Sequence, residues 1–330
     1  MGILKMKSGD TIDTADKFNK RREEIKKHLA QSVYGVIPSR PEHLSAEVVS
    51  EDQSFGGGIG VVRSLNLRLT IDGEVISLPM HSVVPKREGK FPTFIYIDYE
   101  SCVPSKYLPA EEIVERGYNV FCISISNLPE KLIKKLTPNK RRKDSPAKIA
   151  LLAWIISRIA DYAMHQSCVD GDNLAVIGHG LLARAALVAG GYDERFKYVI
   201  LNNFEFGEKY LSRPELFAKR FYEGEDGCCD ELALALCVPR TIMVGAAIND
   251  VISDCEKEQS ALLALDEAYA LFGKGGFTCE VKTDEKMLAE SDSISYHMRE
   301  GVPYLSRRDW NVYMDYIDAK SGENNGKSTL

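Results

Sequence analysis

The sequence predicts an α/β protein with a doubly wound, mostly parallel sheet and an antiparallel hairpin at the N-terminal edge of that sheet. From residue 93 onward, short apolar runs rich in β-branched and aromatic residues alternate with helical patterns. This alternation is typical of parallel sheets with helices on both faces. Before that point, residues 62–85 alternate around Asp72-Gly73, a dipeptide that favours a two-residue hairpin turn.

The remaining elements follow in chain order. Residues 14–30 are charged and predict a surface helix, the proline-containing segment 32–44 predicts an extended connector, and the glycine-rich segment 54–60 predicts a turn rather than a nucleotide loop. Buried strands are predicted at 93–99, 119–125, 173–178, 197–203, 240–247 and 277–284, and helices at 109–117, 147–166, 181–190, 260–273 and 307–319.

The order of these elements divides the chain into three predicted parts. Residues 1–30 are expected to form an N-terminal helical extension, residues 31–319 a single α/β domain, and the polar residues 320–330 a flexible tail.

The composition is that of a globular protein. The chain has 330 residues, 44% of them hydrophobic, and a formal net charge of −6, which does not favour nucleic-acid binding. The basic segment 131–143 departs from this balance. We interpret it as a solvated insertion, with a contact to a partner as the alternative.

Neither a metal site nor a membrane segment is predicted. The eight cysteines show no C-x-x-C spacing, and no His, Asp and Glu cluster has metal-ligand spacing, so we expect no metal and no cofactor. The N-terminal residues lack the apolar core of a signal peptide, and no uninterrupted apolar run reaches the ~18 residues of a membrane span. The sequence therefore predicts a cytoplasmic protein with reduced thiols that does not associate with membranes.

The stretch 174–187, LAVIGHGLLARAAL, has the pattern of a strand, a tight turn and a helix. In the α/β-hydrolase fold, a turn of the form G-x-S-x-G carries the nucleophilic serine between a central strand and a helix. Here the turn is Gly178-His179-Gly180-Leu181-Leu182. Glycine stands at the serine position, and Leu182 stands at the second glycine position.

The chain resembles bacterial α/β-hydrolases related to acetyl xylan and glucuronoyl esterases. The resemblance rests on GHGLLARAALVAGGYDERF (178–196), YLPAEEIVERGYNVF (107–121) and YHMREGVPYLSRRDW (296–310), and it extends over roughly residues 20–319. It implies an α/β-hydrolase fold and descent from carboxylic ester hydrolases.

The resemblance also implies the positions of the catalytic groups, two of which are substituted. The family's serine falls on Gly180, the arginine that follows it on Leu181, and the lysine of the turn on Arg184. The family's catalytic histidine falls on Pro303, which offers no ring nitrogen, whereas the acid position is retained as Asp250.

Other residues near these positions carry alternative roles. His179 is expected to support the turn, and His297 matches a second histidine of the family pattern. Asp254 matches an aspartate of the family's acid loop. Cys102 follows the strand 93–99, where oxyanion donors normally lie, and would act as a nucleophile only beside a base.

Three hypotheses follow. The first is an inactive carbohydrate-esterase-like protein, a pseudoenzyme whose former catalytic cleft binds a small carbohydrate ester or carboxylate. The second is an active ester hydrolase with relocated groups around Cys102, His297 or Asp250. The third is a scaffold for a protein partner, with residues 131–143 as its contact. The sequence predicts no oligomeric state.

Overall fold

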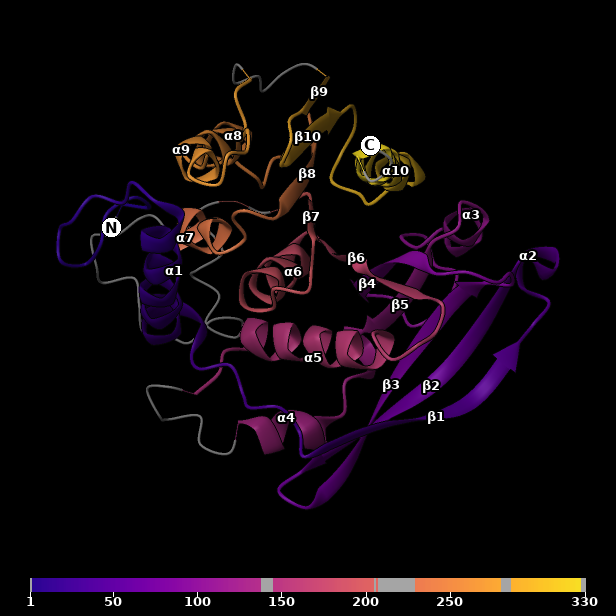
Figure 1. Cartoon of the computed structure of the whole chain (residues 1–330). Helices are drawn as coiled ribbons and strands as arrows, with labels where there is room; N and C mark the ends of the chain where they lie inside the picture. The colour runs from indigo at the N-terminus through magenta and orange to yellow at the C-terminus, as the bar shows by residue number, and fades with distance from the viewer. Residues whose placement is uncertain (1, 138–144, 205, 207–228, 280–285, 328–330) are drawn as a thin grey trace.

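A ten-stranded sheet organises the computed structural model of the chain (Figure 1). The structure describes residues 2–137, 145–204, 206, 229–279 and 286–327. The strands lie in the order β1-β2-β3-β5-β4-β6-β7-β8-β10-β9. This mostly parallel sheet, covered by helices on both faces, confirms the predicted α/β-hydrolase fold class.

The parallel strands form the centre of the sheet and are buried because helices pack on both of its faces. They are β4 (Phe91–Asp98), β5 (Asn119–Ser124), β6 (Val169–His179), β7 (Tyr198–Asn202), β8 (Thr241–Ala247) and β10 (Ile294–Arg299). The short strand β9 (Met287–Glu290) pairs antiparallel with β10 and forms the edge.

The N-terminal strands β1 (His43–Asp52), β2 (Gly60–Ile71) and β3 (Glu74–Pro85) form the antiparallel part of the sheet. The hairpin between β2 and β3 confirms the prediction, because Asp72 and Gly73 both have positive φ, 48° and 72°, as a type I′ turn requires. Strand β1 was not predicted. Nearly all of its residues are exposed, so it lacks the alternation that marks a half-buried strand.

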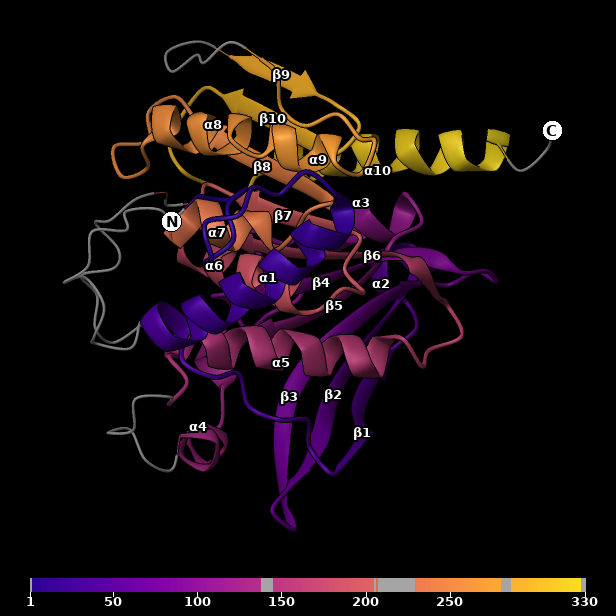
Figure 2. The same cartoon turned by 60° about the vertical axis from the view of Figure 1, so that its left-hand side comes forward.

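Two groups of helices cover the two faces of the sheet (Figures 1 and 2). On one face, the core contains residues of α1 (Ala15–Leu29), α4 (Glu130–Leu136), α5 (Lys148–Ala163), α6 (Leu181–Tyr192), α7 (Cys229–Ala235), α8 (Cys255–Leu263) and α9 (Asp266–Ala270). On the other face, a second core contains residues of α3 (Ala110–Glu115) and α10 (Arg307–Lys327). The short elements η1 (Ala30–Tyr34), α2 (Phe55–Gly58) and η2 (Ile125–Asn127) lie in connections.

Helices lie near both ends of the described chain. In α1, the side chains of Phe18, Ile25 and Leu29 are fully buried in the first core, so this helix packs on the domain. Helix α10 continues to Lys327, through most of the segment 320–330 that was predicted as a flexible tail. Within the described residues, no helix is long and apolar enough to cross a membrane.

Two other predictions fall partly outside the described residues. The strand predicted at 277–284 is wrong where it can be compared, since residues 277–279 are not in a strand and β9 and β10 occupy this part of the sheet. The first part of the basic segment 131–143 forms α4, where Lys131 and Lys135 pair with Glu74 and Asp72 at 2.8 and 3.2 Å. Residues 138–143 lie outside the described part of the chain.

Candidate functional site

The carboxyl ends of the parallel strands meet at one edge of the sheet, where open α/β sheets place their binding sites. The strand register aligns four residues in a row at this edge. His179 of β6 pairs with Asn202 of β7, Asn202 with Gly245 of β8, and Gly245 with His297 of β10. His179 is also the second residue of the predicted turn, residues 178–182.

The chain bends sharply at Gly180, between β6 and α6. Gly180 has φ 56° and ψ −124°, and its N–H donates a hydrogen bond to the Asn202 carbonyl at 2.9 Å. A Cβ atom on Gly178 would overlap the Leu182 carbonyl oxygen. Residue 178 must therefore be glycine, and a positive φ at position 180 is costly for other residues. The geometry is that of a turn that presents a nucleophile, yet Gly180 has no side chain to attack a substrate.

The first residues of α6 bring no exposed charge to this edge. Leu181 is partly buried against the core. Arg184 is fully buried and forms a two-pronged ion pair with Asp230, with nitrogen–oxygen distances of 2.5 and 3.1 Å. The guanidinium group also lies 4.9 Å above the centre of the Phe204 ring. Arg184 therefore holds α6 against α7 and the strand β7 that precedes Phe204.

His179 is buried and bound to Asn202. The Nδ1 atom lies 2.8 Å from the Asn202 Oδ1 atom, which can only accept, so Nδ1 carries the proton and Nε2 keeps a lone pair. Burial lowers the pKa of His179, so the ring is neutral at pH 7. The Tyr107 ring covers it, with 5.4 Å between ring centroids. Asn202 in turn donates to the Tyr313 hydroxyl at 2.9 Å.

His297 is bound to Asp309 at the start of α10, with 2.8 Å between Nε2 and Oδ1. Asp309 is fully buried and also accepts hydrogen bonds from the Arg299 Nε atom at 3.1 Å and the Ser306 hydroxyl at 2.6 Å. Burial raises the pKa of Asp309, but the hydrogen bonds from His297 and Ser306 outweigh it and hold the pKa below its usual range. This cluster ties β10 to α10 on either side of the loop that contains Pro303.

Two hydrogen bonds of Tyr304 hold the loop around Pro303 at the sheet edge. The Tyr304 N–H donates to the Asn203 Oδ1 atom at 3.0 Å, and the Tyr304 hydroxyl donates to the Lys106 carbonyl at 2.9 Å. Asn203 directly follows β7, and the neighbouring Asn202 carbonyl accepts from Gly180. These contacts bring the loop of Pro303 to the same edge as the bend at Gly180.

Asp250 and Asp254 use their carboxylates within their own loop. Asp250 follows β8 and accepts hydrogen bonds from the backbone N–H groups of Ile252 and Ser253 at 2.8 and 3.0 Å. Asp254 caps α8 by accepting from the Lys257 N–H group at 3.1 Å. Asp250 therefore shapes a turn, and Asp254 caps the start of a helix.

The loop after β4 carries Cys102, which is exposed. Asp98 organises this loop, because its Oδ2 atom accepts from the Ser105 hydroxyl at 2.9 Å. The His81 Nε2 atom lies 3.2 Å from the Ser101 carbonyl oxygen. Across the described residues, no base is bonded to the Cys102 thiol.

Several residues of this site carry only weak signals in the sequence. The aromatic rings of Tyr107 and Tyr304 lie 5.0 Å apart at the sheet edge, yet each stands in a loop where an aromatic residue has no distinctive spacing. The Asn202-Asn203 pair was the visible signal, because two polar residues end an otherwise apolar strand. Within the described part of the chain, no group of three or more His, Cys, Asp and Glu could hold a metal ion.

Comparisons with known proteins agree with the fold and the resemblance. No family model matches the chain. The chain is 29% identical over 381 residues to carbohydrate esterase MZ0003 from an unknown prokaryotic organism, a match that covers 96% of this chain and 88% of that protein. It is 25% identical over 208 residues to a 4-O-methyl-glucuronoyl methylesterase from Thermothelomyces thermophilus, covering 58% of this chain and 46% of that protein.

Solved structures show the same fold. A glucuronoyl esterase from Solibacter usitatus superposes with a TM-score of 0.85 at 23% identity, over 97% of both chains. A mutant glucuronoyl esterase from Sporotrichum thermophile, in complex with methyl 4-O-methyl-beta-D-glucopyranuronate, superposes with a TM-score of 0.57 at 18% identity. That match covers 79% of this chain and 74% of the other.

Proposed function

Because the chain is a carbohydrate-esterase-like protein with the α/β-hydrolase fold, we propose that it is catalytically inactive and binds a carbohydrate ester or carboxylate at the edge of its sheet. The observation that carries this proposal is Gly180. The bend has the backbone geometry that would present a nucleophile, with φ 56° and ψ −124°, and the residue there has no side chain.

The size of the catalytic defect supports inactivity. Loss of a triad serine costs about a millionfold in turnover, and loss of the histidine as well adds little because the two act as a unit. Backbone donors alone leave roughly 10³–10⁴-fold acceleration over water. A protein with glycine at 180 and proline at 303 is therefore too slow to serve as an ester hydrolase.

The contacts of the remaining polar groups argue against a relocated triad. A serine or cysteine nucleophile needs a base within hydrogen-bond reach. Among the described residues, His297 is bonded to Asp309 and His179 to Asn202, and neither ring is bonded to a serine or cysteine; Asp250 is bonded within its own loop. An active ester hydrolase that uses Cys102, His297 or Asp250 stays the alternative, and turnover by the unmodified protein distinguishes it.

The same edge offers groups that suit a sugar carrying a carboxyl group. Tyr107 and Tyr304 provide partly buried rings for stacking on the sugar. The Nε2 lone pair of His179 accepts from a sugar hydroxyl, and the N-terminal end of α6 favours a carboxylate or carbonyl oxygen. A related esterase has been solved with a methyl glucuronate derivative, which makes this sugar the first ligand to test.

Ligand binding is tested by titrating methyl glucuronate into the purified protein by calorimetry. We expect saturable binding that weakens about fivefold or more in Tyr107→Ala, because stacking contacts of this kind contribute about 1 kcal/mol or more. Tyr162→Ala serves as the control, since Tyr162 is also a partly buried tyrosine but lies on α5. Equal affinities in both variants would contradict binding at this edge.

The assignment of the bend is tested by restoring the lost groups. In the double variant Gly180→Ser with Pro303→His, we expect covalent labelling by a fluorophosphonate probe, detected by mass spectrometry on residue 180. Gly180→Ser alone should label far more slowly, because no histidine is present to accept the serine proton. A folded double variant that labels no faster than the single variant would contradict the placement of residues 180 and 303 in one site.

A further inference from the structure

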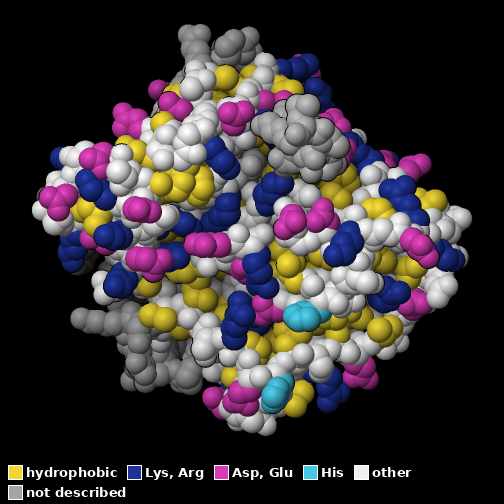
Figure 3. All heavy atoms as spheres, viewed as in Figure 1, with side chains coloured by type: hydrophobic (Ala, Val, Ile, Leu, Met, Phe, Trp, Pro, Cys, Tyr) yellow, Lys and Arg dark blue, Asp and Glu magenta, His cyan; other side chains and the backbone are white. Residues whose placement is uncertain are grey.

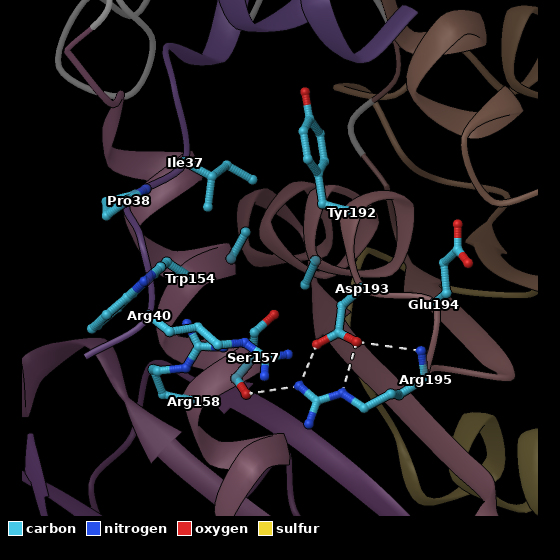
Figure 4. A pocket seen from close by; sticks show the side chains of 12 residues that line it. Ile37, Pro38, Arg40, Trp154, Ser157, Arg158, Tyr192, Asp193, Glu194 and Arg195 are labelled. Carbon is cyan, nitrogen blue, oxygen red and sulfur yellow. Dashed lines mark hydrogen bonds and ion pairs between the residues drawn. The ribbon is translucent and has the colours of Figure 1, made fainter. Parts of the chain in front are cut away.

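A hollow lies beside α5 and the C-terminal end of α6 (Figure 4). It has a volume of about 600 Å³, within the range of small-molecule sites. Its walls come from α5, from the end of α6 with the residues after it, and from the connector between η1 and β1. Because α6 has 12 residues, Tyr192 lies about 18 Å along the helix axis from Gly180. The hollow is therefore separate from the site at the sheet edge.

Two arginines of the hollow are paired with carboxylates. Arg195 binds Asp193 through Nε at 2.9 Å and Nη2 at 2.6 Å, and its Nη1 atom lies 2.7 Å from Asp161. Arg158 donates from Nε to Asp161 at 2.6 Å. The two guanidinium groups and two carboxylates neutralise one another. Glu194, a third acid at the hollow, is paired with Arg22 at 2.9 Å.

Arg40 adds a positive charge that this network does not balance. It is exposed, lines the hollow beside Arg158, and has no carboxylate partner among the residues that the structure describes (Figure 4). Burial lowers the pKa of Arg158, and the neighbouring charges of Arg40 and Arg195 lower it further. The guanidinium groups are thus close enough to repel one another, in a chain whose net charge is −6.

The Nη1 and Nη2 atoms of Arg158 remain available to a ligand. Only its Nε atom is bonded to a carboxylate within the described part of the chain, and the guanidinium lies 5.2 Å from the centre of the Trp154 ring, which fixes its position. Figure 3 shows that Lys and Arg side chains, with acidic side chains between them, gather at the centre of the face that carries α5 and α6. An anion placed between Arg40 and Arg158 would relieve their repulsion.

We propose that this hollow binds a small organic oxyanion, whose carboxylate or phosphate group is held between Arg40 and Arg158. Guanidinium groups bind both kinds of oxyanion through paired N–H donors. Ile37, Pro38 and Tyr192 line the hollow and provide apolar surface for the carbon skeleton of the ligand. The proposal is independent of the site at Gly180.

The test compares three sugars that differ only at one carbon: glucose, glucuronate and glucose 6-phosphate. Each is titrated into the full-length protein at constant ionic strength, and binding is followed by calorimetry and by NMR shifts of amides at the end of α6. We expect glucuronate, glucose 6-phosphate or both to bind and glucose not to bind. The sugar that binds more tightly shows whether the hollow prefers a carboxylate or a phosphate group. Arg40→Gln should weaken binding at this position about tenfold, since a charged hydrogen bond contributes ~1.5 kcal/mol.

Arg308→Gln is the matched control, because Arg308 is also exposed and has no ion pair within the described residues but lies on α10. It removes the same charge and should leave binding unchanged. The variant Tyr107→Ala separates this proposal from the proposed function, since it should weaken binding at the sheet edge and leave the amide shifts at the end of α6 intact. Absence of saturable anion binding at α6, or equal weakening by Arg40→Gln and Arg308→Gln, would overturn the proposal.

Discussion

Glu258 shows how strongly one buried residue can link folding to pH. Its side chain lies in α8 and is 2% exposed. The Oε2 atom accepts from the Tyr296 hydroxyl at 3.1 Å, whereas Oε1 has no hydrogen-bond partner in the described residues. Burial raises the pKa of Glu258 to about 8, against an ordinary value of 4.5, because the charged form would be poorly solvated.

This shift predicts a stability that falls as the solution becomes alkaline. The folded state holds the proton more tightly than the unfolded state, so the stabilisation is complete below pH 4.5 and is lost as the pH rises through about 8. Between these values the contribution falls by up to about 1.4 kcal/mol per pH unit. Glu258→Gln, which stays neutral, should remove this slope when the free energy of unfolding is measured in urea from pH 5 to pH 9.

The control for this prediction lies two residues earlier on the same helix. Glu256 is exposed, so Glu256→Gln removes the same charge without changing a buried group. It should keep the pH dependence of the parent protein. A Glu258→Gln variant with an unchanged slope would show that Glu258 is charged in the folded state.

Residues of the site could be predicted from the sequence only where the signal was local. The bend at Gly180 was visible because the strand, turn and helix are consecutive. The pairing of His179 with Asn202 was not, since 23 residues separate them and the contact depends on strand register. Glu258 and Tyr296 are 38 residues apart, and nothing in the surrounding helix pattern marks Glu258 as buried.

At the scale of elements, strand β8 depends on glycine at one position. A Cβ atom on Gly245 would overlap the Tyr313 hydroxyl and lie 2.8 Å from both Asn202 Nδ2 and His297 Cε1. Gly245→Ala should therefore separate α10 from the sheet and lower the free energy of unfolding by about 2–3 kcal/mol. Chemical denaturation measures this change.

Gly275→Ala is the control for the strand variant, because the nearest atom to its added Cβ would be the Asp292 Oδ2 atom at 3.7 Å. It should change stability by less than about 0.5 kcal/mol. A similar loss in both variants would mean that glycine at 245 is not required by the packing of α10.

Element prediction succeeded where burial gave a continuous apolar pattern. Strand β4 was predicted at 93–99 because it is buried on both faces. Strand β10 was missed because it alternates apolar residues with Ser295 and His297, which are polar but buried. Tertiary contacts satisfy that histidine, and the sequence does not show them.

At the scale of the whole molecule, two cores on opposite faces of one sheet hold the sites in place. Helix α1 belongs to the first core, although it was predicted as an extension. The Phe18 ring is fully buried and contacts the Phe272 ring edge to face, with 5.8 Å between centroids. The N-terminal helix therefore ties together elements that are far apart in the sequence.

This packing predicts that α1 contributes to global stability. Phe18→Ala should lower the free energy of unfolding by about 3–5 kcal/mol, because it leaves a cavity between α1 and the residues that follow α9. Lys20→Ala, at an exposed position of the same helix, should have little effect. Thermal unfolding of both variants measures the difference, and an unchanged midpoint for Phe18→Ala would mean that α1 is a detachable extension.

The most direct test of the account is the rate at which the unmodified protein hydrolyses an aryl acetate and a methyl glucuronate ester. A chain with glycine at position 180 and proline at position 303 should raise neither rate measurably above that of buffer. A rate that grows in proportion to protein concentration and disappears in Cys102→Ala or His297→Ala would contradict the account, because it would show that another side chain performs the chemistry.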